Sequence, residues 1–514
     1  MIPLRTEEPP GARLRAALAA DRPLLHDHPR LRSLLESSAV ADPGEFFLLF
    51  LHHCMATGAA LDQGAAEEDV AGLVSGRWAG AALLAELGHA NSNSRTHTEA
   101  VFDPATREFV LSTPVPGAAK YPATFGPAGF ATLAVVSARL VTGGGEHGTA
   151  LFLVPVRDEH GPCPGVSIEP RPPTALLPLD YATVRFDGVR VPYRRWLRDG
   201  ASITPDGEFH DPLDDTGARG RRTMSMGRFG WGAITVGLAA VARASVSLAL
   251  ERAVRRRTLD RLAGEIPAID HLNQQRLLFG ALASALAATT LARRETARYW
   301  SFGAPPGVHR ELGLTKVAVT SLADSAVNRA RSASGTAGFF SEHRLIGYQG
   351  LTLAFQSAGG DNRLIGLDAA WTMAAGEDYT PPAAAPGADE WVTLFRHRER
   401  LLHEELTAGL DGSFDTWNAH SELALRFVSA HSARRTAEVL SGELPPDLYE
   451  LHCLEEIEAH AGWFLAHGLL TAEQVLGLPE RINAICRRLH RDPTTLEHLL
   501  ARTGRECSVG FQPD

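Results

Sequence analysis

The chain has 514 residues, of which 44% are hydrophobic and 21% charged, and its formal net charge is −10 with a pI near 6.1. This length exceeds a single core and predicts roughly three or four subdomains. The acidic balance argues against nucleic-acid and anionic-membrane partners, and no apolar run approaches the roughly 18–20 residues of a membrane span. The five cysteines are scattered and odd in number, so we expect reduced thiols in a cytoplasmic protein.

Residues 1–100 are predicted to be helical. Apolar clusters at 14–18 and 46–51 suit burial between helices, and residues 70–87 continue the helical pattern. His52 and His53 end the second cluster, where no carboxylate or cysteine lies at ligand spacing. We therefore expect this histidine pair on a helix surface or at a cap, and not in a metal site.

From residue 102 the pattern changes to the period-two alternation of strands, which predicts a β-domain over roughly 101–212. The predicted strands are 109–111, 132–142, 150–156, 166–169 and 183–191. Asp187-Gly188 predicts a hairpin turn inside the last of them. Residues 143–148 fit the Gly-x-Gly-x-x-Gly pattern of dinucleotide sites, but a strand-like stretch follows them, so a hairpin loop is the better interpretation.

Helical spacing returns over residues 213–380. Residues 233–257 carry alanine and leucine at that spacing and end in a basic turn that suits the helix dipole. A linker rich in proline and alanine, residues 378–387, separates this segment from a last helical segment. The predicted domains are 1–100, 101–212, 213–380 and 388–514.

Two glycine-rich turns bound the stretch 331–362. The turn at 334–338, Ser-Gly-Thr-Ala-Gly, lets backbone approach a flat or phosphate-bearing ligand without interference from a Cβ atom. The turn at 359–362, Gly-Gly-Asp-Asn, has one acid, Asp361, and an amide that can cap or hydrogen-bond it. From these residues alone, two ordinary turns between helices remain the alternative interpretation.

Several motifs resemble those of the flavin-dependent acyl-CoA oxidases, members of the acyl-CoA dehydrogenase superfamily. The stretches that carry the likeness are 85–91 (AELGHAN), 120–122 (KYP), 269–279 (IDHLNQQRLLF), 334–338, 359–362, 417–423 and 457–474. The resemblance implies an α+β, acyl-CoA dehydrogenase-like fold. Its parts would be an N-terminal helical domain, a central β-barrel-like domain, a helical bundle that binds flavin, and the extra C-terminal helical domain of the oxidases.

The resemblance also implies FAD as the cofactor. We expect no metal, because the sequence carries no Cys-x-x-Cys or His-Glu-x-x-His motif. The positions to which the resemblance assigns cofactor contacts are Leu87, Gly88, Tyr121, Gly126, Arg255, Gln275, Gly335, Thr336 and Gly338, and it assigns substrate contacts to Asn91 and Arg228. Arg255 would reach the flavin pyrophosphate of a neighbouring subunit, which requires at least a homodimer. Alternatively, it belongs to a solvated basic cluster with Arg256 and Arg257. Two further family contacts are weakened, because Ala85 and Leu272 stand where the oxidases have threonine and glutamine.

The main departure from the family lies at the catalytic glutamate, which aligns with Gly359. Glycine supplies no acid or base, and we expect it to leave the volume of a glutamate side chain empty beside the flavin. The superfamily's other site for this base, expected near Gly227 and Arg228, is not acidic either. Asp361 is the nearest substitute, although a role in holding the turn with Asn362 is the favoured interpretation of this residue.

Three functions fit this pattern. The first is an FAD-dependent oxidoreductase, active in secondary metabolism, that acts with O2 on an acyl thioester of coenzyme A or an acyl-carrier protein by redirected oxidation or oxygenation. The second is an ordinary acyl-CoA oxidase that yields an α,β-unsaturated thioester and H2O2 with another base such as Asp361. The third is a non-catalytic partner subunit, because Ala85, Leu272 and Gly359 are also what a decaying site would show.

Overall fold

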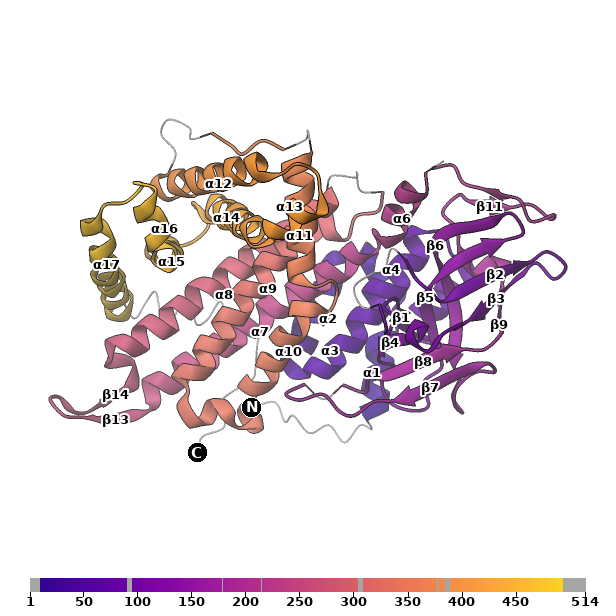
Figure 1. Cartoon of the computed structure of the whole chain (residues 1–514). Helices are drawn as coiled ribbons and strands as arrows, with labels where there is room; N and C mark the ends of the chain where they lie inside the picture. The colour runs from indigo at the N-terminus through magenta and orange to yellow at the C-terminus, as the bar shows by residue number, and fades with distance from the viewer. Residues whose placement is uncertain are drawn as a thin grey trace. The chain divides into compact units, whose positions relative to one another are not determined.

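A computed structural model describes residues 10–89, 95–177, 179–213, 215–303, 308–376, 379–383 and 389–492. The chain divides into two compact units, Met1–Ala233 with Ala297–Pro305, and Ile234–Thr296 with Pro306–Asp514 (Figure 1). The first unit combines helices with β-sheet, and the second is almost entirely helical.

The first unit opens with helices. They are α1 (Pro10–Leu18), α2 (His28–Ala41), α3 (Pro43–Leu49), the π-helix η2 (Phe50–Ala56), α4 (Thr57–Asp62) and α5 (Glu67–Val74). The side chains of Asp27 and Asp42 cap α2 and α3, and each helix has a proline at one of its first two positions. His52 and His53 are buried, and their Nε2 atoms bond the carbonyl oxygens of Leu18 and Ala17 at 3.0 and 2.9 Å. The expectation of a surface or cap position for this pair was therefore wrong.

Two main sheets follow in the first unit, besides a short pair of strands, β11 (Ser202–Ile203) and β12 (Phe209–His210) (Figure 1). The larger sheet has the order β10-β6-β5-β2-β3-β9, with β1 pairing parallel to β5 beside it, and the smaller has the order β4-β8-β7. The strands are β1 (Ala79–Leu83), β2 (Glu99–Asp103), β3 (Glu108–Ser112), β4 (Lys120–Ala123), β5 (Thr132–Thr142), β6 (Gly145–Arg157), β7 (Val166–Pro170), β8 (Ala182–Phe186), β9 (Val189–Pro192) and β10 (Trp196–Leu197). Both sheets contribute side chains to one apolar core, which includes Phe109, Phe152 and Val184.

Two predictions for this unit fail. The helical pattern expected over 70–87 ends with α5, and Ala79–Leu83 forms strand β1. A Cβ on Gly80 would lie 2.6 Å from Cβ of Ala56, so the small side chains of β1 serve close packing against η2. Asp187-Gly188 does not close a hairpin, because β8 pairs with β4 and β7 whereas β9 pairs with β3. The chain crosses there from one sheet to the other.

The second unit takes most of α7 (Gly227–Arg255) and α8 (Leu272–Tyr299), then α9 (Val308–Ala333), α10 (Leu345–Ser357) and α11 (Asn362–Ala375). The hairpin of β13 (Arg257–Asp260) and β14 (Gly264–Pro267) joins α7 to α8, and the short helix η6 (Gly335–Phe339) follows α9. The last helices are α12 (Glu390–Gly409), α13 (Phe414–Ala419), α14 (Ser421–Leu440), α15 (Pro446–Ala459), α16 (Ala461–Ala466) and α17 (Ala472–Arg491).

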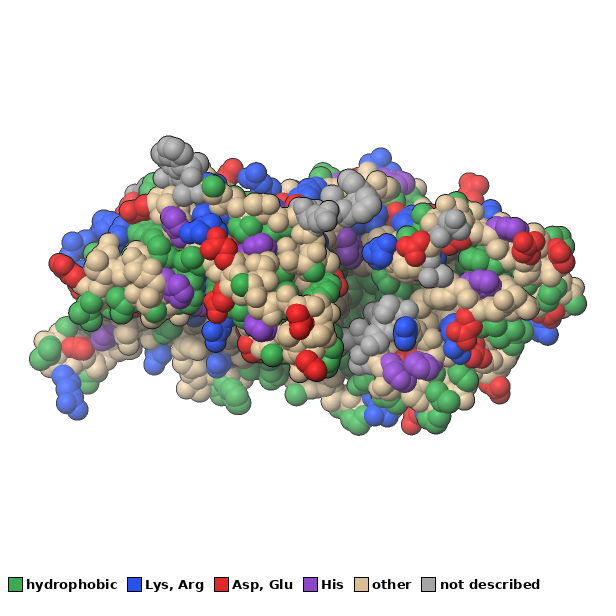
Figure 2. Space-filling model, turned by 45° about the horizontal axis from the view of Figure 1, so that its top comes forward, with side chains coloured by type: hydrophobic (Ala, Val, Ile, Leu, Met, Phe, Trp, Pro, Cys, Tyr) green, Lys and Arg blue, Asp and Glu red, His purple; other side chains and the backbone are tan. Residues whose placement is uncertain are grey.

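Three helical stretches are long and apolar enough to cross a membrane by length and composition. They are Pro43–Asp62, Gly217–Arg255 and Leu272–Tyr299, and between 78% and 94% of their most apolar windows is buried inside the protein. The sequence-based expectation that no run reaches this length was wrong, because alanine-rich core helices meet the same criterion. On the face drawn in Figure 2, acidic and basic side chains of the described residues are interspersed.

Candidate active site

The turn between α10 and α11 is fixed by a buried lysine. Lys316 of α9 is fully buried, and its ammonium donates to the carbonyl oxygens of Phe355 at 3.0 Å and Gly360 at 2.7 Å and to Oδ1 of Asn362 at 2.8 Å. Burial lowers the pKa of Lys316 to about 7, against the opposing effect of the Asp361 charge. Three donors therefore meet three acceptors, and the turn is held in one conformation.

Gly359 lies in this turn in a conformation that suits glycine. Its φ is +68°, and a Cβ atom on it would come 2.5 Å from Cδ1 of Ile234 in α7. Side chains other than glycine rarely adopt this backbone region. The expected empty volume is therefore absent in this direction, since Ile234 occupies the space where a side chain at residue 359 would begin. Ile234 is thus an α7 residue that meets the turn.

Asp361 serves as the N-cap of α11. Its Oδ1 accepts from the backbone N–H groups of Arg363 at 2.9 Å and Leu364 at 3.3 Å. Asn362 completes the turn by donating to Thr320 Oγ1 at 2.9 Å. The structure thus gives Asp361 the turn-holding role, and this engagement weighs against its use as the base.

The glycine-rich turn at 334–338 lies beside the side chain of Arg256. Gly335 has a φ of +62°, and a Cβ atom there would lie 3.1 Å from Nη1 of Arg256. Arg255 instead forms an ion pair with Glu251 at 2.6 Å on the helix surface. Of the neighbouring arginines, Arg256 is therefore the one beside this turn. Thr336 is exposed next to it, so a guanidinium and a hydroxyl are both available to an anionic group.

Gln275 lies in the first turn of α8 and is 3% exposed. Its buried Oε1 atom has no hydrogen-bond partner among the residues that the structure describes. A buried amide oxygen of this kind costs free energy unless a ligand or water donates to it. Gly338 has a packing role instead, because a Cβ atom on it would lie 2.4 Å from the carbonyl oxygen of Arg331.

The motif at 85–91 contains Glu86, which forms a buried ion pair with Lys120 in the first unit. Glu86 Oε1 accepts from the Lys120 ammonium at 3.1 Å, from Thr96 Oγ1 at 2.5 Å and from both the N–H and Oγ1 of Thr98 at 2.8 Å. Burial alone would raise the pKa of Glu86, but Lys120 and these hydrogen bonds outweigh it and lower the pKa to about 2. This network pins the loop to β4 and β5, since Lys120 also donates to Ser137 at 3.1 Å.

Leu87 and Gly88, whose backbone is predicted to contact flavin, use their N–H groups to bond residues 117–119. Leu87 donates to the carbonyl oxygen of Ala119 and Gly88 to that of Gly117, both at 2.8 Å. Both residues are exposed, so their surface remains accessible to a ligand. The glycine at 88 is needed for packing, because a Cβ atom there would lie 3.0 Å from Cα of Gly117.

Tyr121 lies in strand β4, and Gly126 lies in the loop that follows this strand. The Tyr121 ring is half-buried, with the Arg171 guanidinium 5.8 Å from its centroid. Gly126 has a φ of +71°, and a Cβ atom on it would lie 2.9 Å from Leu48 of α3. Gly126 is thus required by packing against a helix, whereas Tyr121 presents an aromatic surface.

Three potential metal ligands come together in the same loop. Oxygen or nitrogen atoms of Glu86, His89 and His97 lie within 4.8 Å of one another. The two imidazole rings are stacked, with centroids 4.0 Å apart and planes inclined by 19°. Nearly parallel stacked rings cannot both direct a nitrogen lone pair at one ion, and the Lys120 ammonium already neutralises Glu86. The cluster is therefore not arranged for a metal.

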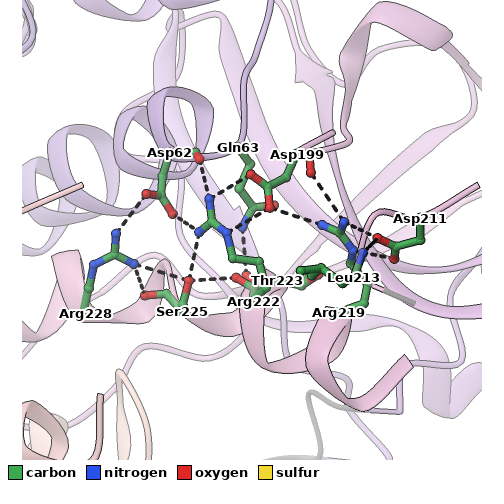
Figure 3. Close-up of polar contacts among 10 residues, drawn as sticks. All are labelled: Asp62, Gln63, Asp199, Asp211, Leu213, Arg219, Arg222, Thr223, Ser225 and Arg228. Carbon is green, nitrogen blue, oxygen red and sulfur yellow. Dashed lines mark hydrogen bonds and ion pairs between the residues drawn. The ribbon is translucent and has the colours of Figure 1, made fainter. Parts of the chain in front are cut away.

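Arg228 belongs to a polar cluster of the first unit (Figure 3). It is 3% exposed, and its guanidinium donates to Asp62 at 2.9 Å and to the carbonyl oxygens of Ser225 at 2.8 Å and Ser301 at 3.1 Å. Arg222 bonds the same aspartate from the other side. These contacts tie the start of α7 to α4 and weigh against the predicted substrate contact. The other predicted substrate residue, Asn91, lies outside the described residues.

The sequence analysis missed Lys316, Ile234 and the Glu86–Lys120 pair. One signal was available, because Lys120 and Lys316 are the only lysines among the 50 basic side chains of the chain. Both are fully buried. A compact ammonium with three donors suits such positions, whereas the planar guanidinium of arginine does not. Ile234 gave no signal, since it is one apolar residue among many in α7.

No protein-family model matches the chain. Among curated proteins, it is 25% identical over 480 residues to the acyl-coenzyme A oxidase-like protein of Mus musculus, a match that covers 81% of this chain and 74% of that protein.

Solved structures show the same fold. Acyl-CoA oxidase 1 from Yarrowia lipolytica superposes with a TM-score of 0.81 at 19% identity, covering 96% of this chain and 81% of that chain. Acyl-CoA oxidase-2 of Caenorhabditis elegans, solved with FAD, ascaroside-CoA and ATP, gives a TM-score of 0.76 at 20% identity, with 88% and 75% covered. The chain therefore has the acyl-CoA dehydrogenase-like fold predicted from its sequence, and its sequence is similar to those of acyl-CoA oxidases and an oxidase-like protein.

Proposed function

We propose that the protein is an FAD-dependent oxidoreductase that acts with O2 on an acyl thioester, by redirected oxidation or oxygenation rather than ordinary desaturation. The likeness to acyl-CoA oxidases supports the cofactor and the substrate class. One observation carries the redirected chemistry: Gly359 has no carboxylate, and Ile234 fills the space beside it. Removal of a weakly acidic α proton without a positioned base typically costs about 10²–10⁴-fold in rate.

The residues present fit FAD. In the second unit, the Gly335 turn with Arg256 offers donors to a pyrophosphate, and the buried Gln275 amide has an oxygen that needs a donor. In the first unit, the Tyr121 ring and the exposed loop at Leu87 and Gly88 offer surface to a flat ring system. When bound, FAD would supply the hydride acceptor and the reaction with O2.

The chain's own groups would position rather than deprotonate the substrate. Lys316 and Asn362 hold the turn at Gly359, and the Asp361 carboxylate is engaged as a cap. A thioester carried by coenzyme A or by an acyl-carrier protein would then react where its C–H bond is acidic enough without a glutamate, or where oxygen adds to it. We further propose a homodimer, as the resemblance implies, in the cytoplasm, as the scattered cysteines indicate.

Cofactor retention tests the flavin part separately from turnover. We expect the purified protein to show flavin absorbance and Arg256→Gln to lower the flavin bound per chain. Arg255→Gln is the matched control, because Arg255 pairs with Glu251 on the helix surface. A colourless wild-type protein, or equal loss in the two variants, would contradict this arrangement.

Product analysis tests the chemistry. Under ¹⁸O2, the expected result is ¹⁸O in the organic product or an oxidised product different from a simple enoyl thioester. Stoichiometric H2O2 with an α,β-unsaturated thioester at the speed of ordinary oxidases would overturn the proposal in favour of desaturation with another base. A protein that binds no flavin would instead support the hypothesis of a non-catalytic subunit. The residues Ala85, Leu272 and Gly359 are consistent with that hypothesis.

A further inference from the structure

The start of α8 is held by two helices of the last helical segment, α15 and α17 (Figure 1). Arg276 of α8 forms an ion pair with Glu458 of α15, and its Nη2 atom lies 2.7 Å from Oε2 of the carboxylate. Just before α8, in the short helix η5 (Ala268–Asp270), Oδ1 of Asp270 lies 3.2 Å from Nε2 of His490 in the last turn of α17. The two contacts fix the chain on both sides of the point where α8 begins.

One turn further along α8, a glycine makes room for a second ion pair. Arg329 of α9 pairs with Glu455 of α15 at 2.7 Å. A Cβ atom on Gly280 would overlap Nη1 of Arg329 and Oε1 of Glu455, so the pair lies directly against the backbone of α8. Arg276 and Gly280 are four residues apart and share one face of α8. Glu455 and Glu458 are three residues apart and share one face of α15, so the two helices are docked in a defined register.

The segment 268–276 also carries groups that suit FAD. Gln275 is buried in it, and its Oε1 atom has no hydrogen-bond partner among the described residues. At the other end of the segment, the backbone N–H of Ala268 donates to the carbonyl oxygen of Arg256 at 2.8 Å. The Arg256 guanidinium lies beside the Gly335 turn. The two polar groups that fit the cofactor in this unit are therefore joined through one short segment.

We propose that Glu458 and His490 are positioning residues for FAD, which fix the segment 268–276 through Arg276 and Asp270. The first residues of a helix lack intrahelical acceptors for their N–H groups, and helix ends open more readily than the middle. Contacts from α15 and α17 reduce the conformations open to this segment before the cofactor binds, and a preorganised site binds its ligand more tightly. The inference rests on the proposed FAD-dependent function, and it gives the last helical segment a part in cofactor binding.

Equilibrium dialysis of the purified full-length protein against FAD tests the proposal. We expect Glu458→Gln to weaken FAD binding about fivefold, which corresponds to about 1 kcal/mol and is in the range of a partly exposed ion pair. Glu450→Gln is the matched control, because Glu450 lies on the same helix but pairs with Arg481 of α17 at 2.6 Å and not with α8. Equal weakening in the two variants would assign to Glu458 a merely structural role in α15, against the proposal.

A charge swap tests whether the pair itself matters. Glu458→Arg places a second cation beside Arg276 and should weaken FAD binding more than Glu458→Gln does. Glu458→Arg combined with Arg276→Glu restores the attraction with the signs exchanged, and we expect it to recover FAD affinity and the absorbance spectrum of the bound flavin. A swapped chain that melts at the wild-type temperature without regaining FAD affinity would refute the positioning role.

Hydrogen exchange of the backbone reports on the segment directly. In Glu458→Gln, the amides of residues 271–280 should exchange faster than in the wild type and in Glu450→Gln, and His490→Ala should have the same effect. Unchanged exchange would overturn the proposal. FAD binding that is insensitive to Glu458→Gln would overturn only the positioning role, whereas a wild-type protein that binds no FAD would overturn the proposed function as well.

Discussion

Ile234 Cδ1 lies 2.5 Å from the position that a Cβ atom on Gly359 would occupy. The helix side chain and the left-handed backbone of the glycine therefore act together against a carboxylate at this position. We therefore infer that a carboxylate side chain introduced at residue 359 would not fit unless Ile234 were also changed.

Gly359→Glu alone is expected to fail as a repair of desaturation. The substitution would place a non-glycine residue at a φ of +68°, which costs roughly 1–3 kcal/mol, and would also clash with Ile234. Gly359→Glu with Ile234→Ala relieves the clash, and we expect peroxide release with a saturated acyl-CoA to rise about 10²-fold over the single variant. A coupled peroxide assay measures this.

Ile234→Ala alone is the control for the double variant, because it opens the same space without adding a carboxylate. Peroxide release that rises equally in this control would mean that access, rather than the base, limits the reaction.

Asp361→Asn should leave turnover nearly unchanged. Asparagine caps helices about as well as aspartate, so the hydrogen bonds to Arg363 and Leu364 survive. Asp361→Ala should lower the free energy of unfolding by about 1 kcal/mol through loss of the cap. Urea unfolding and steady-state kinetics measure the two effects. A loss of about 10²-fold or more in the asparagine variant would identify Asp361 as a base after all.

Lys316→Met should lower the free energy of unfolding by about 1–3 kcal/mol. The carbonyl oxygens of Phe355 and Gly360 lose a buried donor, and such unmet acceptors carry a cost of this order. Lys316→Arg should not rescue the protein, because the larger planar group does not fit the site. Denaturant melts test both variants. Arg363→Gln is the control, since Arg363 is 68% exposed and its ion pair with Glu422 should contribute little.

The Glu86–Lys120 pair predicts a pH dependence. The pKa of Glu86 is lowered to about 2 in the folded protein, below its ordinary value of 4.5. Its contribution to stability is thus fully present above about pH 4.5 and is lost as the pH falls toward 2. The stability difference between the wild type and Glu86→Gln should shrink over that range, as followed by urea melts at several pH values.

At neutral pH, Glu86→Gln should be strongly destabilised, by about 3–5 kcal/mol, because it leaves the buried Lys120 charge unpaired. The double variant Glu86→Gln with Lys120→Met should recover part of this loss. A pH-independent difference between wild type and Glu86→Gln would show that the carboxylate charge is not what matters.

Patterns along the chain predicted the fold well where periodicity is strong. The strand expected over 132–142 is β5 with the same bounds, and the glycine run at 143–145 closes the hairpin with β6. The pairing of the strands on either side of Asp187-Gly188 was not predictable, because a turn dipeptide does not determine which sheet the next strand joins. The strand at Ala79–Leu83 was missed because alanine carries little β-preference, and packing against η2 decides its conformation.

The candidate site was predictable only in part. The motif at 359–362 located the turn, but neither Lys316 nor Ile234 is close to it in sequence. Their roles come from helix packing, which sequence spacing does not reveal. The three arginines at 255–257 show the same limit. Their side chains point in different directions, which the sequence does not reveal, and Arg256 is the one that lies beside Gly335.

The burial of both lysines makes covalent labelling a direct report on folding. An amine-reactive ester would find neither Lys120 nor Lys316 accessible in the native chain. Each acylated lysine detected by mass spectrometry would then mark an opening event, Lys120 in the first unit and Lys316 in the second. The unfolding of the two units could thus be followed separately, because the remaining 48 basic residues are arginines, which such an ester does not acylate.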